Sequence, residues 1–145
     1  MTGLPPRPRV LLADDHTRLR GALRDLLEET GFEVVGESGD GADAVAMARQ
    51  LEPDIVVIDL RMPALNGLDA TRLIKDARPA TQVVVLSAFE SPELERQASE
   101  AGAFASLDKG TMARRIHRVL LAAAVQAVLA ASSGPEPPPR SWRRS

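Results

Sequence analysis

The sequence contains no cysteine, and this absence excludes disulfide bonds and thiol catalysis while fitting a reducing cytoplasm. Only two histidines are present, His16 and His117, which are too few for a structural zinc site. The N-terminal residues lack the apolar stretch of a signal peptide. The longest apolar stretch, residues 119–131, is interrupted by Gln126 and is too short to span a bilayer. We therefore expect a cytoplasmic protein that does not contact a membrane.

An excess of charge is also missing, because the 145 residues carry a net charge of only −2. A nucleic-acid-binding surface normally shows a clustered basic excess, so we expect no direct contact with nucleic acid. The composition is otherwise that of a globular protein, with 44% hydrophobic and 26% charged residues. The length suits one domain, whose core can stabilise itself without cross-links.

Five short runs of residues are predicted to be strands. They cover residues 9–13, 32–36, 54–58, 82–86 and 103–107. The first, third and fourth runs are continuously apolar, which is typical of strands that are covered on both faces in a parallel sheet.

Helical patterns separate these strands and follow the last one. Apolar spacing, capping residues and Gly or Pro stops predict helices at residues 16–30, 42–51, 68–77, 91–101 and 111–131. The alternating order predicts an α/β fold with an open parallel sheet and right-handed crossovers. We expect one domain over residues 8–131, after a flexible start at residues 1–7. The Pro/Arg-rich residues 132–145 have little to bury and are expected to form a disordered tail.

Polar residues follow the predicted strands. Asp14 and Asp15 come after the first strand, Asp59 after the third, Ser87 after the fourth and Lys109 after the fifth. Because the carboxyl ends of parallel strands meet at one edge of a sheet, we expect these side chains to converge. Three carboxylates repel each other unless a cation is present, and ligands that are all oxygen atoms indicate Mg²⁺.

This set of groups suits phosphoryl transfer, which needs mostly positioning and charge neutralisation. Asp59 is the best candidate for a nucleophile that forms an acyl phosphate, because it ends the central strand. Taken singly, Asp15 could be a helix cap, Ser87 an ordinary hydroxyl and Lys109 a surface charge. A carboxylate that closes a buried strand is harder to explain, because it is costly unless paired. We assign no role to His16.

Four separated motifs resemble the receiver domain of two-component response regulators. They are Ala13-Asp14-Asp15, Ile58-Asp59-Leu60-Arg61-Met62-Pro63 followed by Gly67, Leu86-Ser87-Ala88, and Lys109. The resemblance covers roughly residues 8–125 and is strongest to receivers of LuxR-type regulators. It implies a flavodoxin-like (βα)5 sheet in strand order 2-1-3-4-5, with helices on both faces.

The same resemblance implies the role of each site residue. Asp59 is the phosphoacceptor, Ser87 is the switch hydroxyl and Lys109 pairs with the phosphate. The ligands of Mg²⁺ are Asp14, Asp15, Asp59 and the backbone carbonyl of Arg61. The phosphate comes from a sensor histidine kinase or a phosphotransfer protein. The domain catalyses only its own phosphorylation and dephosphorylation, so we do not expect an enzyme with a separate substrate.

The expected output of this domain is a change in a protein–protein interaction face. The resemblance places that face on helix 4, strand 5 and helix 5, where an unidentified effector binds or a homodimer forms on phosphorylation. One departure concerns this face, because Ser106 stands where the family usually has an aromatic residue. Phe104, two residues earlier on the same strand face, is the candidate substitute. Gly110 follows Lys109 where many relatives have proline, and we expect no cis peptide bond there.

Two other functions stay open at this point. The chain could be the receiver portion of a LuxR-type transcriptional regulator that has been cut short, because the residues after Ala131 cannot hold a helix-turn-helix unit. An aspartate-nucleophile phosphatase is the second alternative. That family has an Asp-x-Asp arrangement after its first strand, which Asp14-Asp15-His16 does not provide.

Overall fold

The computed structural model describes residues 6–133, which form one five-stranded sheet with five helices. The strands are β1 (Arg9–Ala13), β2 (Glu33–Ser38), β3 (Ile55–Asp59), β4 (Gln82–Ser87) and β5 (Ala105–Asp108). The helices are α1 (Thr17–Glu29), α2 (Gly41–Leu51), α3 (Gly67–Ala77), α4 (Pro92–Glu100) and α5 (Met112–Ser133). All strand pairs are parallel, in the order β2-β1-β3-β4-β5. The predicted flavodoxin-like fold with strand order 2-1-3-4-5 is confirmed.

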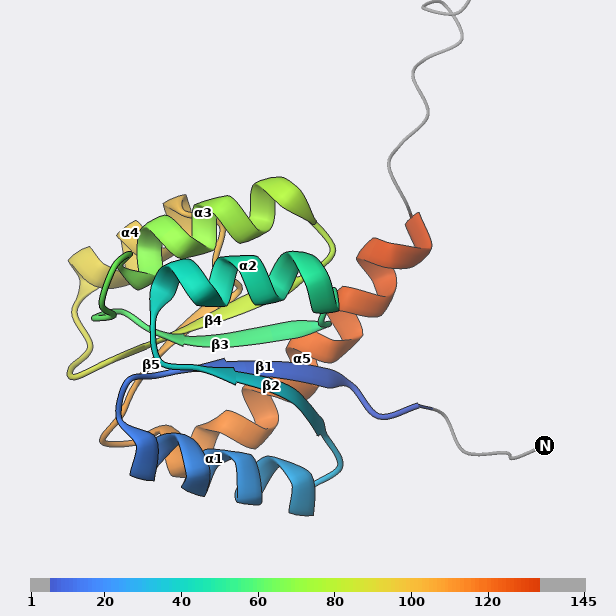
Figure 1. Cartoon of the computed structure of the whole chain (residues 1–145), viewed down its shortest axis with the longest axis horizontal. Helices are drawn as coiled ribbons and strands as arrows, with labels where there is room; N and C mark the ends of the chain where they lie inside the picture. The colour runs from blue at the N-terminus through green and yellow to red at the C-terminus, as the bar shows by residue number, and fades with distance from the viewer. Residues whose placement is uncertain (1–5, 134–145) are drawn as a thin grey trace, which may run out of the picture.

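The sheet is covered on both faces, and this explains its continuously apolar strands. Figure 1 shows α1 and α5 on one face and α2, α3 and α4 on the other. Successive side chains of a strand point to opposite faces. In β1, Val10 and Leu12 therefore pack in the core beneath α1 and α5, whereas Leu11 and Ala13 pack in the core beneath the other three helices. The central strands therefore need apolar residues on both faces, and their polar residues stand at the strand ends.

Several element boundaries differ from the predicted ones. Strand β2 begins at Glu33, and Phe32 lies before it as a buried core residue. Strand β5 begins at Ala105, so Phe104 lies just outside it, although its backbone N–H still donates to the carbonyl of Val83 at 2.7 Å. Helix α5 runs two residues beyond its predicted end, to Ser133. Residues 1–5 of the predicted flexible start and residues 134–145 of the predicted tail lie outside the described residues.

The start of α5 also differs in detail. The helix begins one residue later than predicted, and Thr111 lies before it with its hydroxyl donating to the carboxylate of Asp108. The backbone N–H of Thr111 donates to the same carboxylate at 3.0 Å. The described residues contain no cis peptide bond, so the bond between Lys109 and Gly110 is trans as expected.

Helix α5 is the one helix among residues 6–133 that is long and apolar enough to cross a membrane by length and composition. Residues 119–131 alone are too short to span a bilayer, but the whole helix is not. A core helix of a globular protein passes the same test. In this structure Ile116, Leu120, Ala123 and Ala127 of α5 are buried against the domain.

Candidate functional site

The predicted site residues meet at the carboxyl edge of the sheet. Asp14 directly follows β1, Asp59 ends β3, Ser87 ends β4 and Lys109 directly follows β5. Backbone hydrogen bonds continue between these strand ends, from Lys109 N–H to the Ser87 carbonyl at 2.8 Å and from Asp14 N–H to Ser38 at 2.9 Å. Asp14, Asp59 and Ser87 are only 2–4% exposed. The sheet therefore holds these polar groups in fixed, nearly buried positions.

Lys109 lies between the two buried carboxylates. Its Nζ is 3.1 Å from Oδ2 of Asp14 and 3.1 Å from Oδ2 of Asp59. The contact with Asp59 is a hydrogen bond, whereas the contact with Asp14 is close without hydrogen-bond geometry. Oδ2 of Asp14 is therefore a buried oxygen with no hydrogen-bond donor. Such an oxygen is available to a cation.

The charges at this edge shift the pKa values of their neighbours. Burial raises the pKa of Asp59 above the ordinary value, and it outweighs the opposing hydrogen bond from Lys109. The negative charge of Asp14 adds to the rise. Burial alone would lower the pKa of Lys109, but the hydrogen bond to Asp59 and the charge of Asp14 raise it overall. Lys109 is therefore a firmly protonated ammonium group beside a carboxylate that is costly to keep ionised.

The acidic residues form a group that fits a cation. Ligand atoms of Asp14, Asp15, His16 and Asp59 all lie within 4.8 Å of one another. Three of these residues offer carboxylate oxygens, the donors that Mg²⁺ prefers, and one of them is the nearly buried Asp14, whose Oδ2 has no hydrogen-bond donor. Asp15 is exposed, so the group opens to solvent on one side. Arg61, the residue predicted to contribute a backbone carbonyl, lines the same cavity as Asp15 and Asp59.

Ser87 reaches the site, but its hydroxyl is turned to another partner. Ser87 Oγ donates to the backbone carbonyl of Phe89 at 2.8 Å. Phe89 is 65% exposed and lines the cavity that also contains Asp59 and Lys109. The sequence places the hydroxyl at the strand end but gives no indication of this local hydrogen bond.

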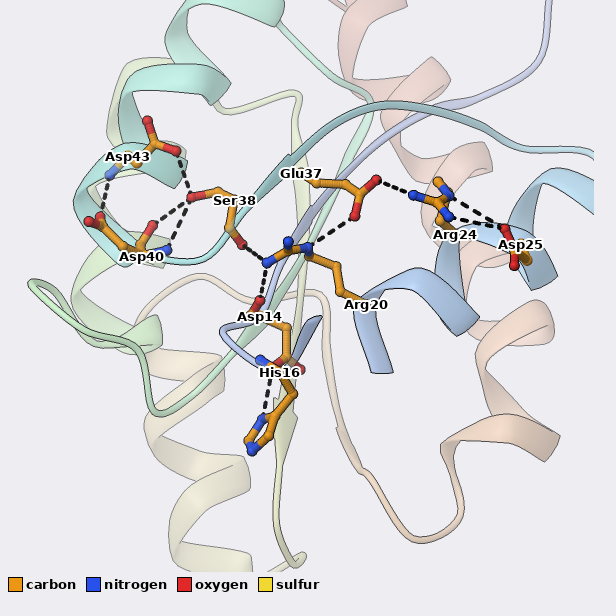
Figure 2. A network of polar contacts seen from close by, with 9 residues as sticks. All are labelled: Asp14, His16, Arg20, Arg24, Asp25, Glu37, Ser38, Asp40 and Asp43. Atoms are coloured by element: carbon orange, nitrogen blue, oxygen red, sulfur yellow. Dashed lines mark hydrogen bonds and ion pairs between the residues drawn. The ribbon is translucent and has the colours of Figure 1, made fainter. Parts of the chain in front are cut away.

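A network behind Asp14 was not predicted from the sequence. Figure 2 shows the guanidinium group of Arg20, from α1, among Asp14, Glu37 and Ser38. Arg20 donates to the carbonyl oxygens of Asp14 at 2.6 Å and Ser38 at 3.3 Å, and it pairs with Glu37 at 3.0 Å. Arg24 donates to the other carboxylate oxygen of Glu37 at 2.9 Å. The network ties α1 and β2 to the backbone that carries the acidic residues. Only the strand order, which places β2 beside β1, could have indicated it.

This network gives the fold a pH-dependent contribution. Burial raises the pKa of Glu37, but hydrogen bonds and charges from Arg24 and Arg20 outweigh burial and hold the pKa below 4.5. A lowered folded-state pKa stabilises the fold above the unfolded value, and this stability is lost as the pH falls through the folded value. Glu37→Gln is therefore expected to cost about 0.5–1 kcal/mol at neutral pH, and this cost should shrink as the pH falls below about 4.5.

Urea unfolding from neutral to acidic pH measures this difference. Glu33→Gln is the matched control, because Glu33 is an exposed glutamate at the other end of β2. Its effect should be small and independent of pH. A Glu37→Gln cost that grows as the pH falls would contradict the assigned ion pairs.

The fold and the strand-end site together define a class of α/β signalling domain, and comparisons with known proteins agree. The chain matches the family model described as response regulator receiver domain over residues 10–121. The chain belongs to this family.

Individual relatives match in the same way. Over 101 residues the chain is 45% identical to the transcriptional regulatory protein PdtaR of Mycobacterium tuberculosis, a match that covers 70% of this chain and 49% of PdtaR. Over 95 residues it is 39% identical to the chemotaxis protein CheY of Thermotoga maritima, covering 66% of this chain and 79% of CheY. The match to PdtaR thus spans about half the length of that relative.

Solved structures show the same fold. The response regulator domain of Thermotoga maritima CheB matches with a TM-score of 0.74 at 32% identity, covering 86% of this chain and 98% of that domain. A two-component response regulator of the LuxR family from Aurantimonas sp. SI85-9A1 matches with a TM-score of 0.78 at 31% identity, covering 82% and 86%. Family membership leaves the phosphatase alternative without support.

Proposed function

We propose that Asp59 accepts a phosphoryl group from a phosphohistidine of a sensor histidine kinase or phosphotransfer protein, in a reaction that depends on Mg²⁺. The observation that carries the proposal is the convergence of Asp59, Asp14 and Lys109, with both carboxylates nearly buried and the ammonium 3.1 Å from each. In the transfer, an Asp59 carboxylate oxygen forms a bond to phosphorus as the phosphorus–nitrogen bond breaks. The electron pair of that bond leaves with the imidazole.

The other residues prepare Asp59 for this step. Asp14, Asp15, Asp59 and the backbone carbonyl of Arg61 would hold Mg²⁺, which when bound neutralises charge on the phosphoryl oxygens. Lys109 already donates to Asp59 and would pair with the phosphate once it is attached. Ser87 would exchange its hydrogen bond to Phe89 for one to a phosphate oxygen. Phe89 lies in the loop before α4, so the loss of this hydrogen bond would release that loop when Asp59 is phosphorylated.

The proposed output face consists of α4, β5 and α5. Phe104 and Ser106 line a hollow with Ala98 and Ser99 of α4, and Phe104 is 37% exposed. The small side chain of Ser106 leaves space where the family usually has an aromatic residue. The shared hollow supports Phe104 as the side chain that responds when the loop before α4 moves. Binding of an effector or a second copy would use this face.

The experiment is labelling of the purified chain with acetyl phosphate, followed by intact-protein mass spectrometry. With Mg²⁺ present, we expect the mass to increase by one phosphoryl group. A chelator or Asp15→Asn should prevent the increase, because the cation can no longer be held. Asp25→Asn is the control, because Asp25 lies on α1 and pairs with Arg24 at the surface. Equal labelling with and without the chelator would contradict the proposed metal dependence.

A second proposal concerns the process that this receiver controls. PdtaR is a transcriptional regulatory protein by name, and the structure from Aurantimonas is of the LuxR family. The match covers only about half of PdtaR. These relatives favour a receiver that controls transcription through a further domain or a partner. The gene sequence downstream of the codon for Ser145 tests this, because a continuing frame with a helix-turn-helix pattern would support it and a stop codon would favour a separate module.

A further inference from the structure

His16 lies against the acidic group in a defined position. It is the residue before α1, and its side chain makes no capping hydrogen bond to the helix. Instead its backbone N–H donates to Oδ1 of Asp14 at 2.8 Å. Its ring Nδ1 lies 3.1 Å from the same oxygen and 3.4 Å from Oδ1 of Asp15. The ring is therefore held at the mouth of the site by the residues that would bind the metal.

The ring also approaches the positive group of the site. Nδ1 of His16 lies 3.4 Å from Nζ of Lys109, which itself contacts Asp14 and Asp59. Asp14 is 2% exposed, and its Oδ2 has no hydrogen-bond donor. An imidazole nitrogen and a buried carboxylate oxygen that lacks a hydrogen-bond donor thus belong to the same small group. Figure 2 shows the His16 ring turned back toward Asp14, on the other side of that residue from Arg20.

We propose that His16 supplies a nitrogen ligand to the cation at this site and shifts its selectivity toward first-row transition ions such as Mn²⁺ and Co²⁺. The inference rests on the proposed metal site of Asp14, Asp15 and Asp59. Imidazole favours transition ions, whereas Mg²⁺ prefers oxygen ligands and retains its waters. Two ligand atoms that are each about 2.1 Å from an ion, and at right angles about it, lie about 3 Å from each other. Nδ1 of His16 lies at similar distances from Oδ1 of Asp14 and Oδ1 of Asp15, 3.1 Å and 3.4 Å.

The two histidines of the chain provide a matched pair for the test. His117 is exposed on α5, and its ring packs edge-on against Phe32 at 5.9 Å between centroids. It takes no part in the acidic group. His16→Asn removes the imidazole but suits the position before a helix, so the fold should be kept. His117→Asn removes an imidazole of the same chemistry elsewhere.

The direct measurement is pulsed electron paramagnetic resonance of Mn²⁺ bound to the full chain, which detects a directly bonded ¹⁴N nucleus. We expect the coupling of an imidazole nitrogen in the wild type and in His117→Asn, and its loss in His16→Asn. Persistence of the coupling in His16→Asn, or its absence from the wild type with Mn²⁺ bound, would overturn the proposal.

Calorimetric titration adds an independent readout. The ratio of Co²⁺ affinity to Mg²⁺ affinity should fall about tenfold or more in His16→Asn, since even outer-shell partners of metal sites change affinity by about 10–100-fold. The ratio should not change in His117→Asn. An unchanged ratio in His16→Asn would also overturn the proposal. Failure of the wild type to bind any divalent ion would instead refute the underlying metal site, so the two failures are distinguishable.

Discussion

Replacing Lys109 with methionine is expected to lower the free energy of unfolding by about 2–3 kcal/mol when no divalent ion is present. The ammonium of Lys109 lies 3.1 Å from Oδ2 of both Asp14 and Asp59, whose side chains are 2% and 5% exposed. Its removal leaves two like charges at one nearly buried place. Breaking a fully buried ion pair costs about 3–5 kcal/mol, and the solvent-facing side of this site reduces that cost.

Mg²⁺ is expected to recover most of this loss. A cation bound between the carboxylates takes over their neutralisation and stabilises the folded state by mass action. Lys75 is the matched control, because it is the one other lysine in the sequence. Its Nζ donates to the backbone carbonyls of Pro79 at 2.6 Å and Thr81 at 2.9 Å. Any loss in Lys75→Met should therefore be insensitive to Mg²⁺.

Urea unfolding of both lysine variants, with Mg²⁺ and with a chelator, measures these effects. We expect the cost of Lys109→Met to shrink on adding Mg²⁺, while that of Lys75→Met stays constant. If Lys109→Met lost the same stability in both conditions, the cation would not be entering the group of carboxylates that Lys109 neutralises.

Gly67→Ala is expected to destabilise the protein by about 1–3 kcal/mol and to weaken divalent-ion binding. A Cβ atom at Gly67 would collide with the carbonyl oxygen of Asp59 and lie 2.9 Å from the Cα of Leu60. Both are backbone atoms, which cannot move aside by a rotamer change to make room for the new Cβ. The end of β3 and the loop after it would have to move, and these carry Asp59 and Arg61. The variant thus tests whether the close approach of α3 positions the site.

Gly21→Ala is the control for this substitution. Gly21 lies inside α1, and a Cβ there would approach only the guanidinium of Arg24, at 3.8 Å. Alanine in the interior of a helix is favoured over glycine by about 0.5–1 kcal/mol. Gly21→Ala should therefore stabilise the protein without changing its affinity for Mg²⁺. A Gly67→Ala variant as stable as the wild type would show that the loop adapts without cost.

Much of the fold could be predicted because burial on both faces leaves a clear pattern. The interior positions of β1, β3 and β4 are all apolar, since their alternate residues enter two different cores. The edge strands were predicted less accurately. Phe32 was included in the predicted strand but packs in the core just ahead of β2, and Phe104 likewise precedes β5. An apolar residue next to a strand gives the same signal as one inside it.

The meeting of the site residues could be predicted because the strand ends fix the positions of their Cα atoms at one edge of the sheet. Asp14, Asp59 and Lys109 meet for this reason. Contacts that depend on side-chain direction could not be predicted. The hydroxyl of Ser87 turns to the carbonyl of Phe89, and the ring of His16 turns back to Asp14. Neither direction follows from the position in the sequence.

The identity of the phosphorylated residue is the most direct test of the account. After labelling with acetyl phosphate and Mg²⁺, borohydride reduction converts an aspartyl phosphate to homoserine, which peptide mass spectrometry can locate. Asp54→Asn is the matched control, because Asp54 lies at the opposite end of β3 and accepts from the backbone of Arg9 at 2.8 Å. We expect homoserine at position 59 in the wild type and in Asp54→Asn, and no labelling of Asp59→Asn. Labelling of Asp59→Asn to the wild-type level, or homoserine at another position, would contradict it.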